Sequence, residues 1–377
     1  MRRRGFLISG ATASAGMAVV GGGLTWGSSR EAEAILAADG AAGARSVPQV
    51  LVERSTAGTS TVRPENSFDF VAVHQETAES TSIRFEYADG FGEWRPLHFH
   101  ADGRDDLAPA YSALVRAPAE TTGYEVRTEG SATVECAAMN LHDGNPVRIE
   151  GQAEGELHAD GQAADSGRRV AYVTRAGWGA DESLRFDDAG NEVWPAESYP
   201  VQAITVHHTA WQTSGDYAAD VRAVYQLHAV EQAWGDIGYH LLIDPDGRVY
   251  EGRHSGDDPL PVFAEPPSPE KAESVTAGHV LQMNSGNIGV CLLGDFTDEM
   301  PTRAAQDSLV NVLRTLCRIT GVDPTAEVEY VNPVNGATAT MQSVSRHRDW
   351  LATECPGNTF AEQFDTAVRQ RVVAGLR

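Results

Sequence analysis

The hydrophobic pattern of this 377-residue chain changes character near residue 150. From about residue 47 to residue 143 apolar and polar side chains alternate, as at Ile83, Phe85 and Tyr87, which is the period of half-buried strands. After residue 168, strand-like apolar runs alternate with segments of helical period, such as residues 216–234. Because the chain is long for one compact core, we predict two domains of different classes.

The change of pattern coincides with residues 150–168, which are small, polar and acidic. Such a composition offers little to bury, so we predict a flexible linker there. Turn residues separate the strands before it, which predicts a small all-β, sandwich-like domain over residues 45–149. The alternation after it predicts an α/β domain with one central sheet over residues 169–377.

The first residues have the pattern of an export signal. Three arginines, Arg2 to Arg4, precede an apolar run that reaches Trp26, and the order Arg-Arg-x-Phe-Leu resembles a twin-arginine signal. An uncleaved membrane anchor is the alternative, although glycines interrupt the short apolar run. We predict that residues 1–44 hold the signal and the mature N-terminal tail. Since no later run approaches the ~18 apolar residues that span a bilayer, we predict an exported protein without stable membrane insertion after signal removal.

The charge and the cysteines narrow the class of protein further. The chain has 29 basic and 53 acidic residues, a net charge of -24, which repels phosphate backbones, so we predict no nucleic-acid partner. Four cysteines are too few for a disulfide framework at this length. Cys291 and Cys317 either pair with each other or remain buried thiols.

Three side chains suited to binding a metal follow strand-like or polar segments of the second domain. His207 ends an apolar run, while His347 and Cys355 bracket a short polar loop, residues 348–354. Two imidazoles and one thiolate suit zinc, and three protein ligands leave the fourth position open for catalysis. With 12 histidines in the chain, accidental triplets remain an alternative on these residues alone.

Five blocks of the second domain carry a resemblance to a known family. In order they are Arg175–Ala180, Ile204–Ala210, Asp236–Arg253, Asn287–Val290 and His347–Gly357. They resemble the peptidoglycan recognition protein and type 2 N-acetylmuramoyl-L-alanine amidase family. The resemblance covers about residues 169–377 only, and it implies an α/β amidase domain with a central mixed β-sheet flanked by helices.

The resemblance also implies roles for individual residues. It makes His207, His347 and Cys355 zinc ligands and Tyr239 a catalytic residue. The second residue before the cysteine is lysine in phage enzymes and threonine in many recognition-type amidases, so Thr353 becomes the other catalytic residue. The substrate groove is expected to include His228, Trp234, His279 and Asn284.

The activity that the resemblance implies is zinc-dependent hydrolysis of the amide bond between N-acetylmuramic acid and L-alanine. The partner is then peptidoglycan or its muropeptides, and the location is extracellular or associated with the cell wall. A catalytically weak or inactive peptidoglycan-binding module is the alternative. Binding-only relatives commonly lose the metal cysteine, so Cys355 favours the enzyme. A secreted zinc peptidase is disfavoured because the His-Glu-x-x-His motif is absent from the sequence.

Two segments leave their roles open. The proline-rich residues 255–276 interrupt the family pattern and either wall the groove or form a solvated loop. The N-terminal β domain attaches to the wall, presents substrate or serves as a folding spacer.

Overall fold

The computed structural model describes most of the chain from residue 43 onward. The described ranges are 43–57, 60–76, 79–99, 103–108, 111–130, 134–158, 169–256, 260–268 and 271–376. The chain divides into Met1–Gly40 and Ala41–Arg377, and all described residues belong to the second unit. The predicted export signal therefore lies almost entirely outside the described residues. Within them, no helix has both the length and the apolar character needed to cross a bilayer.

The N-terminal part is built from two antiparallel sheets, and this confirms the predicted sandwich-like all-β region. One sheet has the strand order β2-β9-β3-β7, and in the other β4 pairs with β5, β6 and β8. Apolar residues of both sheets form a common core, including Val71, Ile83, Tyr124 and Val126. The strands are β2 (Leu51–Ala57), β3 (Phe70–Gln75), β4 (Thr81–Tyr87), β5 (Gly90–Phe91), β6 (Arg95–Pro96), β7 (Tyr111–Arg116), β8 (Gly123–Thr128) and β9 (Val134–Asn140).

The C-terminal part contains a seven-stranded sheet with the order β11-β12-β16-β15-β18-β14-β21. The pairs β11–β12 and β15–β16 are antiparallel, and the other four pairs are parallel. The predicted central mixed sheet is thus confirmed. Its strands are β11 (Glu154–His158), β12 (Arg169–Val173), β14 (Ala203–His208), β15 (Leu241–Ile243), β16 (Val249–Glu251), β18 (Asn287–Leu292) and β21 (Val344–Arg346).

One strand of this sheet corrects the predicted linker. Residues 154–158, inside the segment expected to be flexible, form β11 and pair with β12 at the edge of the sheet. Leu157, the apolar residue of this strand, is 1% exposed and packs into the core. An edge strand pairs with a single neighbour, and charged side chains are common on such strands. The acidic composition of residues 154–158 is therefore compatible with a strand. Residues 159–168 lie outside the described residues.

Helices cover both faces of the seven-stranded sheet. Residues of α3 share a core with the side chains of Leu242 and Cys291 on one face, whereas α4, α5 and η4 share a core with Ile204 and Val206 on the other. The long helix α4 begins where the Thr302 side chain accepts a hydrogen bond from the Ala305 N–H, a common N-cap. The helices are α3 (Tyr217–Gln226), π-helical η2 (Leu227–Glu231), α4 (Arg303–Thr320), α5 (Asn358–Phe364), π-helical η4 (Asp365–Arg369) and α6 (Gln370–Ala374).

Smaller elements connect these layers. The proline-rich segment 255–276 was expected to wall a groove or to be solvated, yet Val262 and Phe263 are fully buried in the core on the α4 face. Their apolar side chains anchor the insertion. The remaining elements are β1 (Arg45–Pro48) with β10 (Pro146–Ile149), β13 (Ser198–Pro200) with β17 (Glu273–Val275), β19 (Glu327–Val331) with β20 (Thr338–Gln342), α2 (Arg175–Trp178), and 3-10 helices η1 (Glu182–Arg185) and η3 (His347–Asp349).

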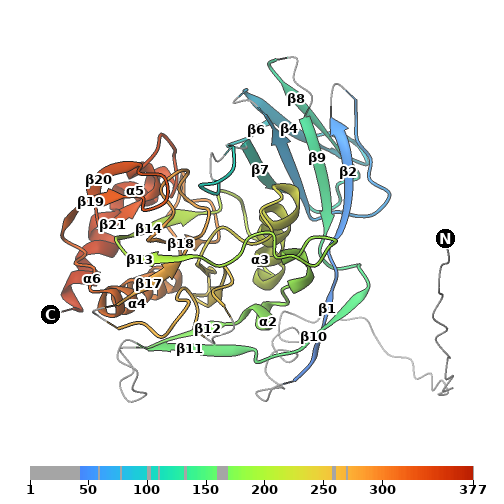
Figure 1. Cartoon of the computed structure of the whole chain (residues 1–377). Coiled ribbons are helices and arrows are strands. Elements are labelled where there is room, and N and C mark those ends of the chain that lie inside the picture. The colour runs from blue at the N-terminus through green and yellow to red at the C-terminus, as the bar shows by residue number, and fades with distance from the viewer. Residues whose placement is uncertain are drawn as a thin grey trace, which may run out of the picture. The chain divides into compact units, whose positions relative to one another are not determined.

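Strand β3 of the N-terminal part is buried on both faces of its sheet. Val71 and Val73 face the sandwich core, while Phe70 and Ala72 join the core around α3. Phe70 meets Trp211 edge to face, with ring centroids 4.9 Å apart. In Figure 1, α3 lies between these strands and the seven-stranded sheet. The two parts that the sequence separates therefore share one hydrophobic core.

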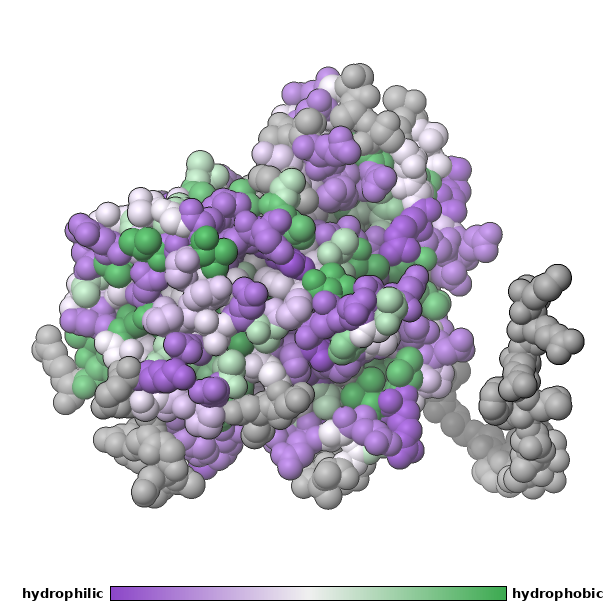
Figure 2. All heavy atoms as spheres, in the orientation of Figure 1, coloured by the Kyte–Doolittle hydropathy of each residue, from purple (hydrophilic) through white to green (hydrophobic). Residues whose placement is uncertain are grey.

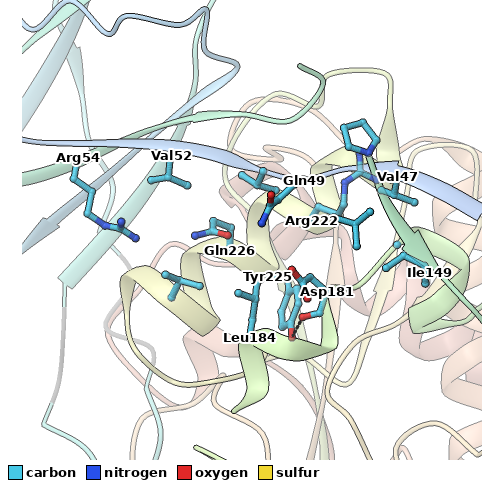
Figure 3. A pocket seen from close by; sticks show the side chains of 15 residues that line it. Val47, Gln49, Val52, Arg54, Ile149, Asp181, Leu184, Arg222, Tyr225 and Gln226 are labelled. Carbon is cyan, nitrogen blue, oxygen red and sulfur yellow. Dashed lines mark hydrogen bonds between the residues drawn. The ribbon is translucent and has the colours of Figure 1, made fainter. Parts of the chain in front are cut away.

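The seam between the two parts also encloses a cavity of about 200 Å³ (Figure 3). It is lined by residues of β1, β2, β10, η1 and α3, among them Val47, Val52, Leu184 and Arg222. None of the predicted site residues lines it.

Figure 2 shows that hydrophilic residues cover much of the displayed face, with hydrophobic residues interspersed among them.

Cys291 and Cys317 are both buried and form no disulfide. Cys291 belongs to the core on the α3 face of the sheet and Cys317 to the core on the α4 face. The sheet separates them, so the structure supports the alternative of two buried thiols. Burial raises the pKa of the Cys317 thiol to about 12.

A buried carboxylate ties three segments of the C-terminal part together. Asp236 is fully buried, with Oδ1 2.9 Å from Arg175 Nη1 and Oδ2 2.8 Å from Arg253 Nη1. It also accepts backbone N–H groups from Ile237 and His254. Burial acts to raise the pKa of Asp236, but the two guanidinium groups outweigh it and lower the pKa to about 2. This ion triad holds α2 and the β16 hairpin against the segment that leads to Tyr239.

We expect Asp236→Asn to lower the free energy of unfolding by about 3–5 kcal/mol at neutral pH, because it leaves buried guanidinium groups without their counter-charge. The depressed pKa means that the carboxylate stabilises the fold fully above its unfolded pKa of ~3.9 and loses this effect as the pH falls toward about 2. Urea unfolding at several pH values measures this. The difference in the free energy of unfolding between the wild type and Asp236→Asn must shrink as the solution becomes acidic.

Glu150→Gln is the matched control, since its partner Arg148 and Glu150 itself are both 74% exposed and such pairs contribute little. Equal loss of stability in both variants, or a difference that does not change with pH, would contradict the role of the Asp236 triad.

Candidate metal centre

The structure brings the three predicted metal ligands together. His207 lies near the end of β14, His347 opens η3 directly after β21, and Cys355 lies in the loop before α5. Because β14 and β21 are parallel neighbours, their carboxyl ends meet at one edge of the sheet. One nitrogen of each histidine and the Cys355 sulfur all lie within 4.8 Å of one another. The three residues are at most 1% exposed.

The donor set fits zinc by type and by spacing. Two imidazoles and a thiolate are ligands that zinc prefers, and usual bond lengths in a tetrahedral site put a nitrogen and a sulfur about 3.6 Å apart. His207 Nδ1 and Cys355 Sγ are 3.8 Å apart. Three protein donors leave a fourth position open for water or substrate.

A second histidine decides which nitrogen of His207 faces the other ligands. His207 Nε2 is 3.0 Å from His279 Nδ1, and His279 Nε2 is 3.0 Å from the Asn287 carbonyl oxygen. A carbonyl only accepts, so His279 Nε2 carries the hydrogen, and its Nδ1 accepts from His207 Nε2. Burial, together with the nearby His240, lowers the pKa of His279 well below its usual value, so the ring is neutral. His207 Nδ1 is thereby left as the metal-binding atom.

The loop that carries His279 is held by Asn284. The Asn284 side-chain oxygen accepts the N–H of His279 at 2.7 Å and of Val280 at 2.8 Å. Both His279 and Asn284 are fully buried. In the structure they lie behind His207 and hold its ring, and their predicted contact with substrate stays a prediction.

Trp234 is 2% exposed, and its ring packs against Trp194 and His228. Its predicted groove contact stays a prediction. His228 lies beside Tyr239. Its Nδ1 accepts the Gly238 N–H, and its ring centroid is 5.5 Å from that of Tyr239. The substrate role of His228 stays a prediction.

Both predicted catalytic residues lie beside the candidate ligands. The Tyr239 ring centroid is 5.3 Å from that of His207, and Tyr239 lines a cavity of about 40 Å³. Thr353 Oγ1 accepts the Cys355 N–H at 3.2 Å, which leaves its own hydrogen able to donate. The catalytic roles of both residues stay predictions.

Sequence reasoning missed two contributions to this site. Gly289 is required because a Cβ there would lie 2.5 Å from the His279 ring. The Asn-Ile-Gly-Val block pointed to this glycine without revealing its purpose. Ser112 and Leu114 of β7 line the cavity beside Tyr239. Nothing in the alternating pattern of β7 distinguishes them from other strand residues.

Comparisons with known proteins concern the C-terminal part. Residues 197–358 match a family model described as N-acetylmuramoyl-L-alanine amidase. Peptidoglycan-recognition protein LE of Drosophila melanogaster is 25% identical over 199 residues, covering 52% of this chain and 46% of that protein. N-acetylmuramoyl-L-alanine amidase of Homo sapiens is 27% identical over 172 residues, covering 44% of this chain and 24% of that protein. The chain thus spans less than half the length of either relative.

Among solved structures, wild-type Drosophila PGRP-LB matches with 22% sequence identity and a TM-score of 0.36. The match covers 52% of this chain and 92% of that one.

We expect His279→Ala to weaken zinc binding by about 10–100-fold, because His207 loses the partner that fixes its tautomer and ring orientation. Competition with a fluorescent zinc chelator measures the affinity. His228→Ala is the control, since the His228 ring contacts Trp234 and Tyr239 instead. Unchanged affinity in the His279 variant would show that His207 is oriented without it.

Proposed function

Because residues 197–358 form a domain of the N-acetylmuramoyl-L-alanine amidase family, we propose that the protein is a zinc-dependent peptidoglycan amidase. Its reaction is hydrolysis of the amide bond between N-acetylmuramic acid and L-alanine. The observation that carries the proposal is the buried cluster of His207, His347 and Cys355 with Tyr239 beside it. A recognition module needs the groove but has no need of a three-ligand site with an open fourth position.

The chemistry that zinc supplies when bound is Lewis acidity, which polarises a carbonyl and acidifies water. The chain's own residues do the rest. His207 keeps its Nδ1 directed at the site through its bond to His279. Cys355 is almost fully buried, so its thiolate charge is poorly screened and strengthens the interaction with a cation.

Tyr239 and Thr353 are proposed to stabilise the negative charge that develops on the carbonyl oxygen. A phenol and an aliphatic hydroxyl are neutral donors near pH 7, and neither is an effective base there. Fixed donors in a site with little water are worth more than the same donors in bulk solvent. Thr353 is fixed because it accepts the Cys355 N–H. His228 and the cavity beside Tyr239 are the proposed contacts for the peptide or glycan flanking the bond.

The proposed site of action is outside the cytoplasm. The arginine-rich start and apolar run of residues 1–26 support export, and peptidoglycan is an extracytoplasmic substrate. The net charge of -24 disfavours nucleic acid as a competing partner.

Incubation of the purified protein with peptidoglycan tests the proposed reaction directly. We expect new muramoyl lactyl carboxyl groups and new L-alanine amino termini by mass spectrometry. A chelator should abolish them, and added zinc should restore them. Cleavage at another bond contradicts the assignment. Binding without any cleavage, in protein that holds zinc, favours the recognition module.

We expect Tyr239→Phe to keep its zinc but to lose about 10²–10³-fold in kcat, the usual cost of removing one oxyanion donor. Tyr199→Phe is the matched control. Tyr199 lies in β13, and its hydroxyl contacts Glu197 rather than the candidate metal ligands. Zinc content and turnover on muropeptides are measured together. Full turnover in Tyr239→Phe would remove this phenol from the mechanism.

A further inference from the structure

A segment of the N-terminal β part enters the C-terminal part close to the metal centre. Arg104 is 7% exposed, and its guanidinium packs over the Trp194 ring at 4.7 Å. It donates to the carbonyl oxygens of Trp234 and Val193. These contacts anchor residues 103–106 against the amidase domain. The next residue, Asp105, is thereby held at a fixed place.

The carboxylate of Asp105 receives donors from three residues of the C-terminal part. Asn284 Nδ2 is 2.5 Å from Oδ1, and Asn332 Nδ2 is 2.7 Å from Oδ2. Ser285 Oγ is 3.5 Å from Oδ2, and the Asn284 backbone N–H also points to Oδ2. Hydrogen bonds to an ionised acceptor are stronger than neutral ones, so this carboxylate fixes the Asn284 side chain.

Fixing Asn284 has a consequence at the metal ligand. With both hydrogens of its Nδ2 donated to Asp105 and the Gly103 carbonyl, the Asn284 oxygen must face the N–H groups of His279 and Val280. This places the His279 ring where its Nδ1 accepts from His207. A continuous path of hydrogen bonds and one short piece of backbone thus links Asp105 to a metal ligand.

We propose that Asp105 is a positioning residue for the metal centre, acting through Asn284 and His279 on His207. The proposal rests on the metal site of the proposed function. It gives the N-terminal β part a task in the active site: it supplies an outer partner from beyond the matched residues 197–358. Outer partners of metal ligands are worth about 10–100-fold in affinity.

Zinc affinity of the full chain tests the proposal, measured by competition with a fluorescent chelator and without any substrate. We expect Asp105→Ala to weaken zinc binding about tenfold, the lower end of the range for outer partners. Asp105→Asn keeps one oxygen that accepts from Asn284 and should recover part of the loss. Asp89→Asn is the matched control, because Asp89 is an exposed carboxylate of the same N-terminal part, in the turn between β4 and β5.

A merely structural role predicts another result. In that case the melting temperatures of the zinc-free and zinc-loaded forms fall together, while the zinc affinity of Asp105→Ala stays within about twofold of wild type. That outcome overturns the proposal, and so does an equal loss in Asp89→Asn. Failure of the wild-type chain to bind zinc instead overturns the proposed function itself, so the two failures are distinguishable.

A double-mutant cycle tests the path. If Asp105 acts through Asn284, then Asp105→Ala combined with Asn284→Ala binds zinc no more weakly than Asn284→Ala alone. Additive losses would mean that Asp105 reaches the site by another route and would contradict the path through Asn284.

Discussion

The hydrogen bond between His207 and His279 is the interaction on which the metal centre depends. It assigns the hydrogen of His207 to Nε2 and leaves Nδ1 to face Cys355. The bond is buried, so it is little weakened by competing water, and Gly289 provides the space that the His279 ring needs. These contacts therefore fix the direction of the His207 ring, and the three candidate ligands already lie at distances that suit a tetrahedral set.

The second constraint is the sheet of β2, β9, β3 and β7, in which β3 is buried on both faces. Alternate residues of β3 serve the sandwich core and the core around α3, because successive side chains of a strand point to opposite faces. An apolar sheet face of this kind is stable only when something covers it. Docking against α3 provides the cover, and it also brings Ser112 and Leu114 next to Tyr239. Packing and site architecture are thus two results of one interface.

Much of the site could be predicted, and the exceptions share one cause. Chemistry and spacing offered His207, His347 and Cys355 as candidate ligands, and the resemblance to the amidase family selected this set from the other histidines of the chain. Trp234, His279 and Asn284 were expected in a groove, but whether a side chain faces solvent or lies behind another residue depends on what packs over it. The strand at residues 154–158 was missed because its pairing with β12 is a long-range contact that an acidic composition hides.

The sequence alone determined the two structural classes, the order of the strands and helices near the site, and the residues able to hold zinc. It did so because periodicity and donor chemistry are local properties of the chain. Only the tertiary structure decided that the two parts share a core, that His279 supports a ligand, and that Asp105 reaches Asn284 across 179 positions. These are contacts between distant segments, whose formation depends on the packing of the whole fold and leaves no periodic trace in the sequence.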